Sequence, residues 1–210
     1  MRVQVAAAAG ITLGHAAAHR QQILAGITLD DRIRRAAAGI ALVVDMQNSV
    51  VANAHRRDDV ISNIDALIRR ARVDGVSVIW IQHSGDSLVM DSDEWQYVPE
   101  LQRQAPETLV HKRYGDSFED TVLESELARL QVGRLIVTGA QTDACIRATI
   151  HGAFTRGYDT VLVSDAHTTE DLSGYGLPPP DKVIAHTNMY WSWQSAPGRT
   201  ACVAKTKDVE

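Results

Sequence analysis

The sequence predicts an α/β fold of the doubly wound type, in which helices cover both faces of a mostly parallel sheet. From about residue 39 onward, short apolar runs rich in branched residues alternate with segments of helical periodicity, the order of repeated strand–helix–strand units. The chain of 210 residues is long enough for one domain with a sizeable core. Its hydrophobic share of 45% and charged share of 22% lie close to globular averages, which argues against a fibrous or disordered chain.

Strands are expected where branched apolar residues cluster. The first covers 40–44 and ends at the polar Asp45, and the others are expected at 76–81, 108–110, 135–138, 160–163 and 200–205. Helical spacing predicts helices at 60–71, 121–130, 144–155 and from the proline break at 178–180 to about residue 193. Acidic residues in the first turn and Gly75 after the last turn support the first helix. The stretch 86–106 has no sustained period, and such long excursions often serve a site.

The region before the first strand is expected to be an N-terminal extension, residues 1–38, followed by the folded domain, residues 39–210. The extension faintly suggests a signal peptide, with one arginine, a weak apolar middle and small residues, but we favour a segment that the core does not need. No apolar run in the sequence reaches the ~18 residues of a membrane span. We therefore expect a cytoplasmic protein with no membrane partner.

The charge pattern bears on possible partners. A formal net charge of -5 and scattered arginines offer no basic surface for a polyanion, so we expect no nucleic-acid partner. Trp191 and Trp193 fit either core packing or the subunit interface of a homo-oligomer, which we expect this protein to form. The expected ligand is a small-molecule substrate.

Three residue types that can do chemistry come at predicted strand ends. Asp45 and Lys112 each follow a strand, and Cys145 lies just beyond the turn 139–142, so all three are expected at the carboxyl edge where open parallel sheets bind ligands. The first turn of a helix and a nearby lysine both favour a thiolate, so we expect Cys145 to be ionised near neutral pH. Asp45 could take the thiol proton and pass it to a departing amine, and the amides of the turn could hold an oxyanion.

Each of these residues also has an ordinary structural explanation. An aspartate after a strand can cap a turn, and a lone cysteine is usually a buried small hydrophobe. A lysine is usually a solvated surface charge. The same holds for His167, which follows a strand and could belong to a site or to a capping loop. Cys202 lies inside an apolar strand, and we expect it to be a buried small hydrophobe.

Three motifs together make the chain similar to the isochorismatase-like hydrolases, a superfamily that includes nicotinamidases, N-carbamoylsarcosine amidases and ureidoacrylate hydrolases. They are LVVDMQNSV around Asp45, HKRYGDSFEDTVLESEL around Lys112, and LIVTGAQTDACIRATIHGAFTRGYDTVLVSDA around Cys145. The resemblance covers about residues 39–205, and the order aspartate, lysine, cysteine agrees throughout. It implies that Asp45, Lys112 and Cys145 form a catalytic triad.

The same resemblance implies further structural features. The fold would be a three-layer, Rossmann-like arrangement with a six-stranded parallel sheet in the order 3-2-1-4-5-6. A non-proline cis peptide would join Ala140 and Gln141, and the amides of Gln141 and Cys145 would hold the oxyanion. Several side chains would line the substrate pocket, although aromatic residues are more often core, Gln47 could cap a turn and a lone histidine is more often structural. These pocket residues are Gln47, Trp80, His83, Tyr114 and Phe118.

The sequence departs from the nicotinamidase pattern at the metal site. That site needs an Asp-x-His pair and a further histidine after the second strand, whereas this chain has Gln82-His83-Ser84-Gly85-Asp86 there. The resemblance therefore implies no catalytic zinc or iron, and we expect no cofactor.

The retained Cys145 favours the C–N hydrolysing branches of the superfamily. We therefore predict a cysteine hydrolase that cleaves an amide, ureide or carbamoyl bond of a small molecule through a thioester on Cys145. Two alternatives remain open. One is an isochorismatase-type vinyl-ether hydrolase that uses Asp45 as the acid, and the other is a non-catalytic binding protein that kept the fold.

Overall fold

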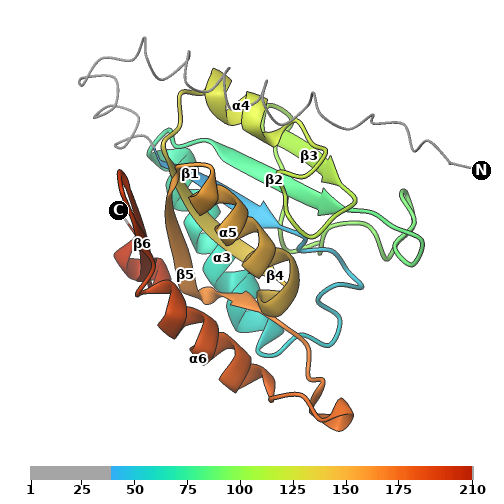
Figure 1. Cartoon of the computed structure of the whole chain (residues 1–210). Coiled ribbons are helices and arrows are strands. Elements are labelled where there is room, and N and C mark those ends of the chain that lie inside the picture. The colour runs from blue at the N-terminus through green and yellow to red at the C-terminus, as the bar shows by residue number, and fades with distance from the viewer. Residues whose placement is uncertain (1–38, 210) are drawn as a thin grey trace, which may run out of the picture. The chain divides into compact units, whose positions relative to one another are not determined.

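The computed structural model of the chain describes residues 39–209, so the expected extension 1–38 lies outside the described residues. The described chain folds into one sheet with helices on both faces (Figure 1). No helix among the described residues is long and apolar enough to cross a membrane.

The sheet has seven strands in the order β3-β2-β1-β4-β5-β7-β6. Every neighbouring pair is parallel except β6 and β7. The predicted α/β class and parallel sheet are confirmed, and one strand is added to the predicted six. Strand bounds are β1 Gly39–Val44, β2 Val78–His83, β3 Thr108–Lys112, β4 Arg134–Ala140, β5 Asp159–Thr168, β6 Ser195–Ala196 and β7 Arg199–Ala204.

The additional strand is β6, which has only two residues and pairs back against β7 through Pro197 and Gly198. Gly198 adopts a positive φ of 74°, which suits a tight turn. A two-residue strand is too short to produce a periodic pattern, so the sequence could not reveal it.

The helices divide between the two faces of the sheet. On one face lies α3 (Arg57–Val73), and on the other lie α4 (Leu123–Arg129), α5 (Arg147–Thr155) and α6 (Pro180–Trp191) (Figure 1). β1 contributes to both interfaces because successive side chains of a strand point to opposite faces. Ala41 and Val43 pack towards α3, whereas Leu42 and Val44 pack towards α5. This double burial explains why β1 reads as a continuous apolar run.

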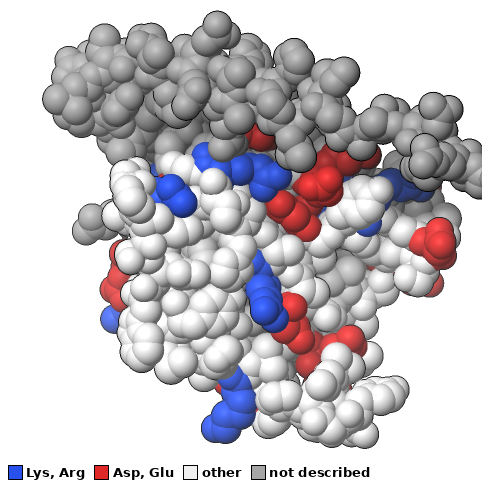
Figure 2. Space-filling model, viewed as in Figure 1, with Lys and Arg blue, Asp and Glu red and all other residues white. Residues whose placement is uncertain are grey.

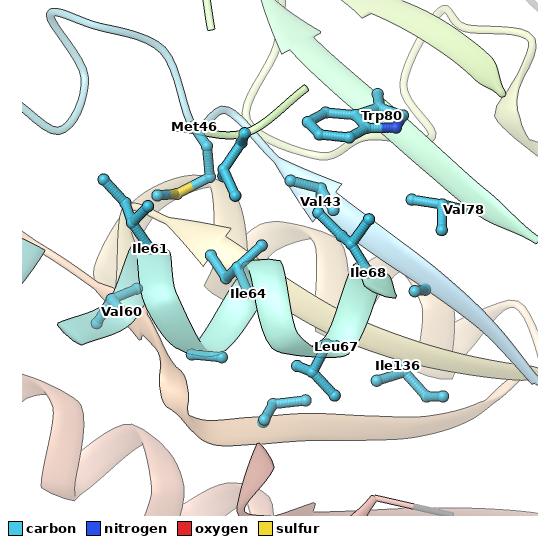
Figure 3. Close-up of a cluster of buried hydrophobic side chains, with 14 of the residues drawn as sticks. Val43, Met46, Val60, Ile61, Ile64, Leu67, Ile68, Val78, Trp80 and Ile136 are labelled. Carbon is cyan, nitrogen blue, oxygen red and sulfur yellow. The ribbon is translucent and has the colours of Figure 1, made fainter. Parts of the chain in front are cut away.

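The amphipathic helix α3 shows how the core forms. Its apolar residues at helical spacing are all buried: Val60, Ile61, Ile64, Leu67, Ile68 and Ala71. They pack on Val43, Val78, Trp80 and Ile136 of the sheet (Figure 3). Burying one such aliphatic side chain contributes about 1.5–3 kcal/mol. The Asp58 and Asp59 carboxylates in the first turn, and arginines in the last, complement the helix dipole.

Gly139 brings β4 unusually close to β1 at the carboxyl edge. Its φ is +122°, and a Cβ added there would lie 2.0 Å from the backbone oxygen of Val44. Only glycine fits such an approach. Because Val44 precedes Asp45 and Gly139 precedes the turn to Cys145, this contact sets the distance between two of the predicted catalytic residues.

β5 is longer than the sequence predicted, because it continues through the polar Ser164 and Asp165 to Thr168. A bulge between Val137 and Gly139 shifts the register, after which Gly139 pairs with His167. The Asp165 carboxylate accepts hydrogen bonds from the amide and hydroxyl of Thr206 at 2.8 and 2.7 Å. Polar residues that looked like a strand end are therefore paired inside the strand.

The surface carries both signs of charge. On the face shown in Figure 2, basic and acidic side chains are interspersed. Exposed ion pairs occur as well, such as Arg56 with Asp59 at 2.8 Å. The two tryptophans near the chain's end differ: Trp191 is fully buried in the α5-side core, whereas Trp193 is 76% exposed.

Candidate active site

Three strand ends bring a carboxylate, an ammonium and a thiol together at the carboxyl edge of the sheet. Asp45 directly follows β1, Lys112 is the last residue of β3, and Cys145 lies on η1 (Thr142–Ile146), one π-helical turn between β4 and α5. Lys112 Nζ lies 2.7 Å from Asp45 Oδ2 and 3.1 Å from Cys145 Sγ. The three residues that the sequence placed at strand ends thus form one cluster.

Asp45 is almost completely buried, at 1% exposure. Its backbone amide donates to Ile81 O at 2.9 Å, which fixes it against β2. Burial raises the pKa of the Asp45 carboxyl above its usual value, and the Lys112 ammonium opposes this rise. Among the described residues neither carboxylate oxygen accepts a hydrogen bond of regular geometry, so the ion pair with Lys112 is its main stabilising contact. Such a carboxylate is suited to accept a proton.

Lys112 is equally buried and stands between four acceptors. Besides Asp45 and Cys145, its Nζ lies 3.1 Å from Tyr114 O and 3.2 Å from His83 Nδ1. An ammonium has three N–H groups, which matches its three hydrogen-bond contacts with Cys145 Sγ, Tyr114 O and His83 Nδ1. The Asp45 carboxylate is held by the ion pair instead.

The surroundings of Cys145 work against the thiolate that the sequence predicts, because burial raises the pKa of its thiol. Burial and the Asp45 carboxylate raise its pKa to about 12, although Lys112 acts in the opposite direction. The dipole argument failed because the sulfur is desolvated beside a negative charge. Moving the proton from sulfur to Asp45 leaves the net charge of the cluster unchanged, so the thiolate can form without releasing a proton to solvent.

The turn before Cys145 contains the non-proline cis peptide that the family resemblance implied. The peptide bond between Ala140 and Gln141 is cis. The backbone oxygen of Gln141 accepts hydrogen bonds from the amides of Ala144 and Ile146, both at 3.1 Å. The helix expected to start at residue 144 instead begins with η1, and α5 starts at Arg147.

The residues predicted to line the pocket fall into two groups. His83 and Tyr114 adjoin the cluster, because the His83 ring and the Tyr114 backbone oxygen contact Lys112. Trp80 and Phe118 lie in the core instead, since both point inward from the sheet and the loop. The Trp80 Nε1–H donates to Glu107 at 2.8 Å, and the Phe118 ring stacks on Tyr158.

The buried side chain of Gln47 holds the backbone of His83 and Trp95 through hydrogen bonds. Its Oε1 accepts from the His83 amide at 2.9 Å, and its Nε2 donates to His83 O at 3.0 Å and to Trp95 O at 2.7 Å. These bonds join the end of β2 to the excursion 86–106. Because its polar atoms are engaged this way, Gln47 positions the site instead of contacting the substrate that the sequence suggested.

Three possible metal-binding residues also meet in this cluster. Donor atoms of Asp45, His83 and Cys145 lie within 4.8 Å of one another. All three face the Lys112 ammonium, at 2.7, 3.2 and 3.1 Å respectively. The cation that this donor set surrounds is therefore Lys112, and a metal ion would have to displace it.

A separate cleft of about 650 Å³ lies between α5 and α6. Asp143 and Arg147, which flank Cys145 in sequence, line it, and the triad residues do not. Asp143 of η1 thus faces this cleft, whereas Cys145 of the same turn does not line it.

A buried histidine network behind η1 was not recognised from the sequence. His167 Nδ1 lies 2.8 Å from Thr142 Oγ1, and Nε2 lies 3.0 Å from Asn188 Oδ1 of α6. The sequence marked His167 only as a residue after a strand, and nothing in its local pattern identifies these two partners. The network fixes the first residue of the turn that carries Cys145.

The His167 network predicts a pH-dependent stability. Burial lowers the pKa of His167 to about 4 from an ordinary 6.5. As the pH falls, the His167 ring is protonated in the unfolded chain before it is protonated in the folded protein. The contribution of neutral His167 to the free energy of unfolding is therefore complete above pH 6.5 and is lost between about pH 6.5 and pH 4. The loss amounts to roughly 3 kcal/mol at about 1.4 kcal/mol per pKa unit. Between pH 7 and pH 5, the free energy of unfolding measured in urea should decrease less for His167→Gln than for the unmodified protein. Equal decreases in the two proteins would contradict this assignment.

Cys202 lies far from this site on β7, and it is exposed, so the prediction that it is buried is wrong. The reason is its place near the sheet edge. Among the described residues, the sheet continues beyond β7 with just the two-residue β6, and Thr200 and Cys202, on the same side of the strand, are both exposed.

Comparison with known proteins supports a common origin for this arrangement. The model of the isochorismatase domain family matches residues 40–176. A streptothricin hydrolase of Streptomyces noursei is 32% identical over 137 residues, covering 62% of this chain and 54% of the relative. A ureidoacrylate amidohydrolase of Yersinia enterocolitica is 26% identical over 171 residues, covering 61% of this chain and 74% of the relative.

The fold agrees with that of solved structures. The crystal structure of an isochorismatase from Pseudomonas putida is similar with a TM-score of 0.73 and 26% identity, covering 82% of this chain and 90% of that one. The chain spans about half the length of the streptothricin hydrolases that it matches. Because the family model covers well over half of the chain, the chain belongs to the isochorismatase family.

Proposed function

We propose that this chain is a cysteine hydrolase that cleaves the C–N bond of a small amide, ureide or carbamoyl compound. The observation that carries the proposal is a pair of short contacts at one ammonium. Lys112 Nζ lies 2.7 Å from the Asp45 carboxylate and 3.1 Å from the Cys145 sulfur. A nucleophile, a proton acceptor and a fixed positive charge are the groups that covalent acyl transfer needs.

In the first half of the proposed reaction, Cys145 gives its proton to Asp45, and the sulfur bonds to the substrate carbonyl carbon. The carbonyl electron pair moves to the oxygen, where the backbone amides of Gln141 and Cys145 would stabilise the negative charge. Asp45 then gives the proton to the nitrogen, the C–N bond breaks, and an amine or ammonia leaves a thioester on Cys145.

In the second half, a water gives a proton to Asp45 and attacks the thioester carbon. The S–C bond breaks, the acid product leaves, and Asp45 returns the proton to the Cys145 sulfur. Lys112 stabilises negative charge on whichever of the two groups carries it, so one ammonium serves both halves.

Names of the relatives agree with this class of reaction. The relatives include a ureidoacrylate amidohydrolase and a nicotinamidase, both C–N hydrolases. We propose the same bond class for this chain. A panel of primary amides, ureides and N-carbamoyl compounds, assayed for released ammonia or amine, tests it directly. Hydrolysis of isochorismate with no C–N cleavage across the panel would contradict it.

The pH dependence separates this proposal from a second candidate. The raised pKa of Asp45 would also suit an acid that protonates a vinyl ether, the isochorismatase-type reaction. C–N cleavage needs Asp45 as the base, so kcat/KM should fall as the pH is lowered through the Asp45 pKa. Vinyl-ether cleavage needs the protonated form, so its kcat/KM should rise over the same range. The pH profile of kcat/KM for each substrate class is the measurement, and a rise towards acid pH for an amide would contradict the first mechanism.

A further inference from the structure

The extended end of β5 lies directly against η1. After the bulge in β4, pairing resumes between Gly139 and His167 and continues to the ends of both strands. The His167 ring then contacts the Thr142 hydroxyl at 2.8 Å. The Thr169 hydroxyl, just beyond β5, donates to the Asp143 carboxylate at 2.7 Å. The first two residues of η1 are thus held by side chains from this part of the chain.

The hydrogen bonds of the His167 network run in one direction. Asn188 Nδ2 donates to Ser164 O at 3.3 Å, and its Oδ1 faces His167 Nε2 at 3.0 Å. An amide oxygen can only accept, so Nε2 carries the ring hydrogen and Nδ1 accepts from the Thr142 hydroxyl. Burial lowers the pKa of His167 to about 4, so the ring is neutral near pH 7, as this arrangement requires.

Thr142 occupies the middle of the turn that the proposed mechanism uses. It lies between Gln141 and Cys145, whose backbone amides would hold the oxyanion, and its side chain is completely buried. A directed hydrogen bond from a buried hydroxyl limits the rotation of that residue more narrowly than apolar packing does. Backbone amides stabilise an oxyanion well only when they are already aimed at it as the charge develops.

We propose that His167 is a positioning residue that, through the Thr142 hydroxyl, aims the backbone amides of η1 at the carbonyl oxygen of the substrate. The inference rests on the proposed covalent mechanism and adds a buried network outside the triad to it. The amides act on charge that appears only during the reaction. Loss of the network should therefore slow attack on a carbonyl and leave the reactivity of the Cys145 thiol unchanged.

Two reagents separate these two properties. In a Cys202→Ala background, Cys145 is the one thiol of the chain. With p-nitrophenyl acetate, the sulfur bonds to the carbonyl carbon, the electron pair moves to the oxygen and returns, and p-nitrophenolate leaves. With iodoacetamide, the sulfur bonds to a saturated carbon as iodide leaves, and no oxyanion forms. Released p-nitrophenolate and intact-protein mass give the acylation and alkylation rates.

The main variant is Thr142→Val, which keeps the shape of the side chain and removes the hydroxyl donor. We expect its acylation rate to fall about tenfold and its alkylation rate to stay within about twofold. Thr142→Ser, which keeps the donor, should recover most of the acylation rate. An equal fall of both rates in Thr142→Val, or no change in either, would overturn the proposal.

A matched control removes another buried hydroxyl from the same strand. The Thr160 hydroxyl donates to Tyr158 O at 3.3 Å near the opposite end of β5, so Thr160→Val should leave the ratio of the two rates unchanged. A second variant, Asn188→Ala, keeps the test decisive if Thr142→Val does not fold. Asn188 is only partly buried, and its loss should lower acylation about threefold without slowing alkylation. An unchanged ratio in Asn188→Ala would overturn the proposal.

The reagents need no natural substrate, so the positioning role and the proposed function can fail separately. The predicted rate pattern without C–N cleavage of any panel compound would contradict the proposed function and support the role of His167. C–N cleavage with an unchanged ratio in Thr142→Val would do the reverse. In ¹⁵N-histidine-labelled protein, the His167 hydrogen should lie on Nε2, and a hydrogen on Nδ1 would overturn the direction of the network.

Discussion

Replacing Cys145 by alanine should lower kcat for the C–N substrate by roughly 10³-fold or more, because the variant lacks the atom that forms the covalent bond. The fold should persist, since the change removes only one partly buried sulfur at the margin of the α5-side core. We expect a stability change within about 1 kcal/mol, measured by urea unfolding. The loss of activity would then reflect chemistry instead of unfolding.

The second cysteine provides the matched control. Cys202 is exposed on β7, away from the triad, so Cys202→Ala should keep the full kcat. A Cys145→Ala protein with near-normal turnover would exclude the thioester route. Aspartate-driven protonation would then be the better explanation of the same cluster.

The largest expected effect on stability comes from Gly139→Ala. The added Cβ would lie 2.0 Å from Val44 O and 2.8 Å from Val44 N, so the two strands at the centre of the sheet would have to separate. The backbone would also be strained, because φ is +122° at this position. We expect a loss above about 4 kcal/mol in urea unfolding, or failure to accumulate folded protein.

Gly157→Ala separates the two causes. Its φ of +93° is also unfavourable for alanine, but an added Cβ would meet nothing within 4 Å. That variant should therefore show only the conformational cost of about 1–2 kcal/mol. If Gly139→Ala proved no more destabilising than Gly157→Ala, the close approach of β4 to β1 would not be essential to the fold.

The sequence was most informative where burial produced a long pattern. β1 reads as a continuous apolar run because both of its faces are covered, and α3 shows six buried positions at helical spacing. These patterns alone are enough to place Asp45 at a strand end. The same patterns could not show that the three triad residues meet, because no periodic signal indicates that Lys112 reaches from β3 to Asp45.

Features that depend on tertiary contacts could not be predicted. Ser164 and Asp165 looked like a strand end, but a bulge in β4 and the contact with Thr206 extend β5 past them. The exposure of Cys202 depends on what lies beyond β7. The ionisation of Cys145 depends on desolvation beside Asp45, which local helix position does not reveal.

The covalent step is the central claim, and intact-protein mass spectrometry tests it most directly. The unmodified protein should be mixed with the best C–N substrate of the panel and quenched in acid before one turnover is complete. We predict a mass increase equal to the acyl group, located on the peptide that contains Cys145, removed by hydroxylamine and missing from Cys145→Ala. Continued product formation with no adduct on Cys145 at any quench time, and with an undiminished rate in Cys145→Ala, would contradict the account.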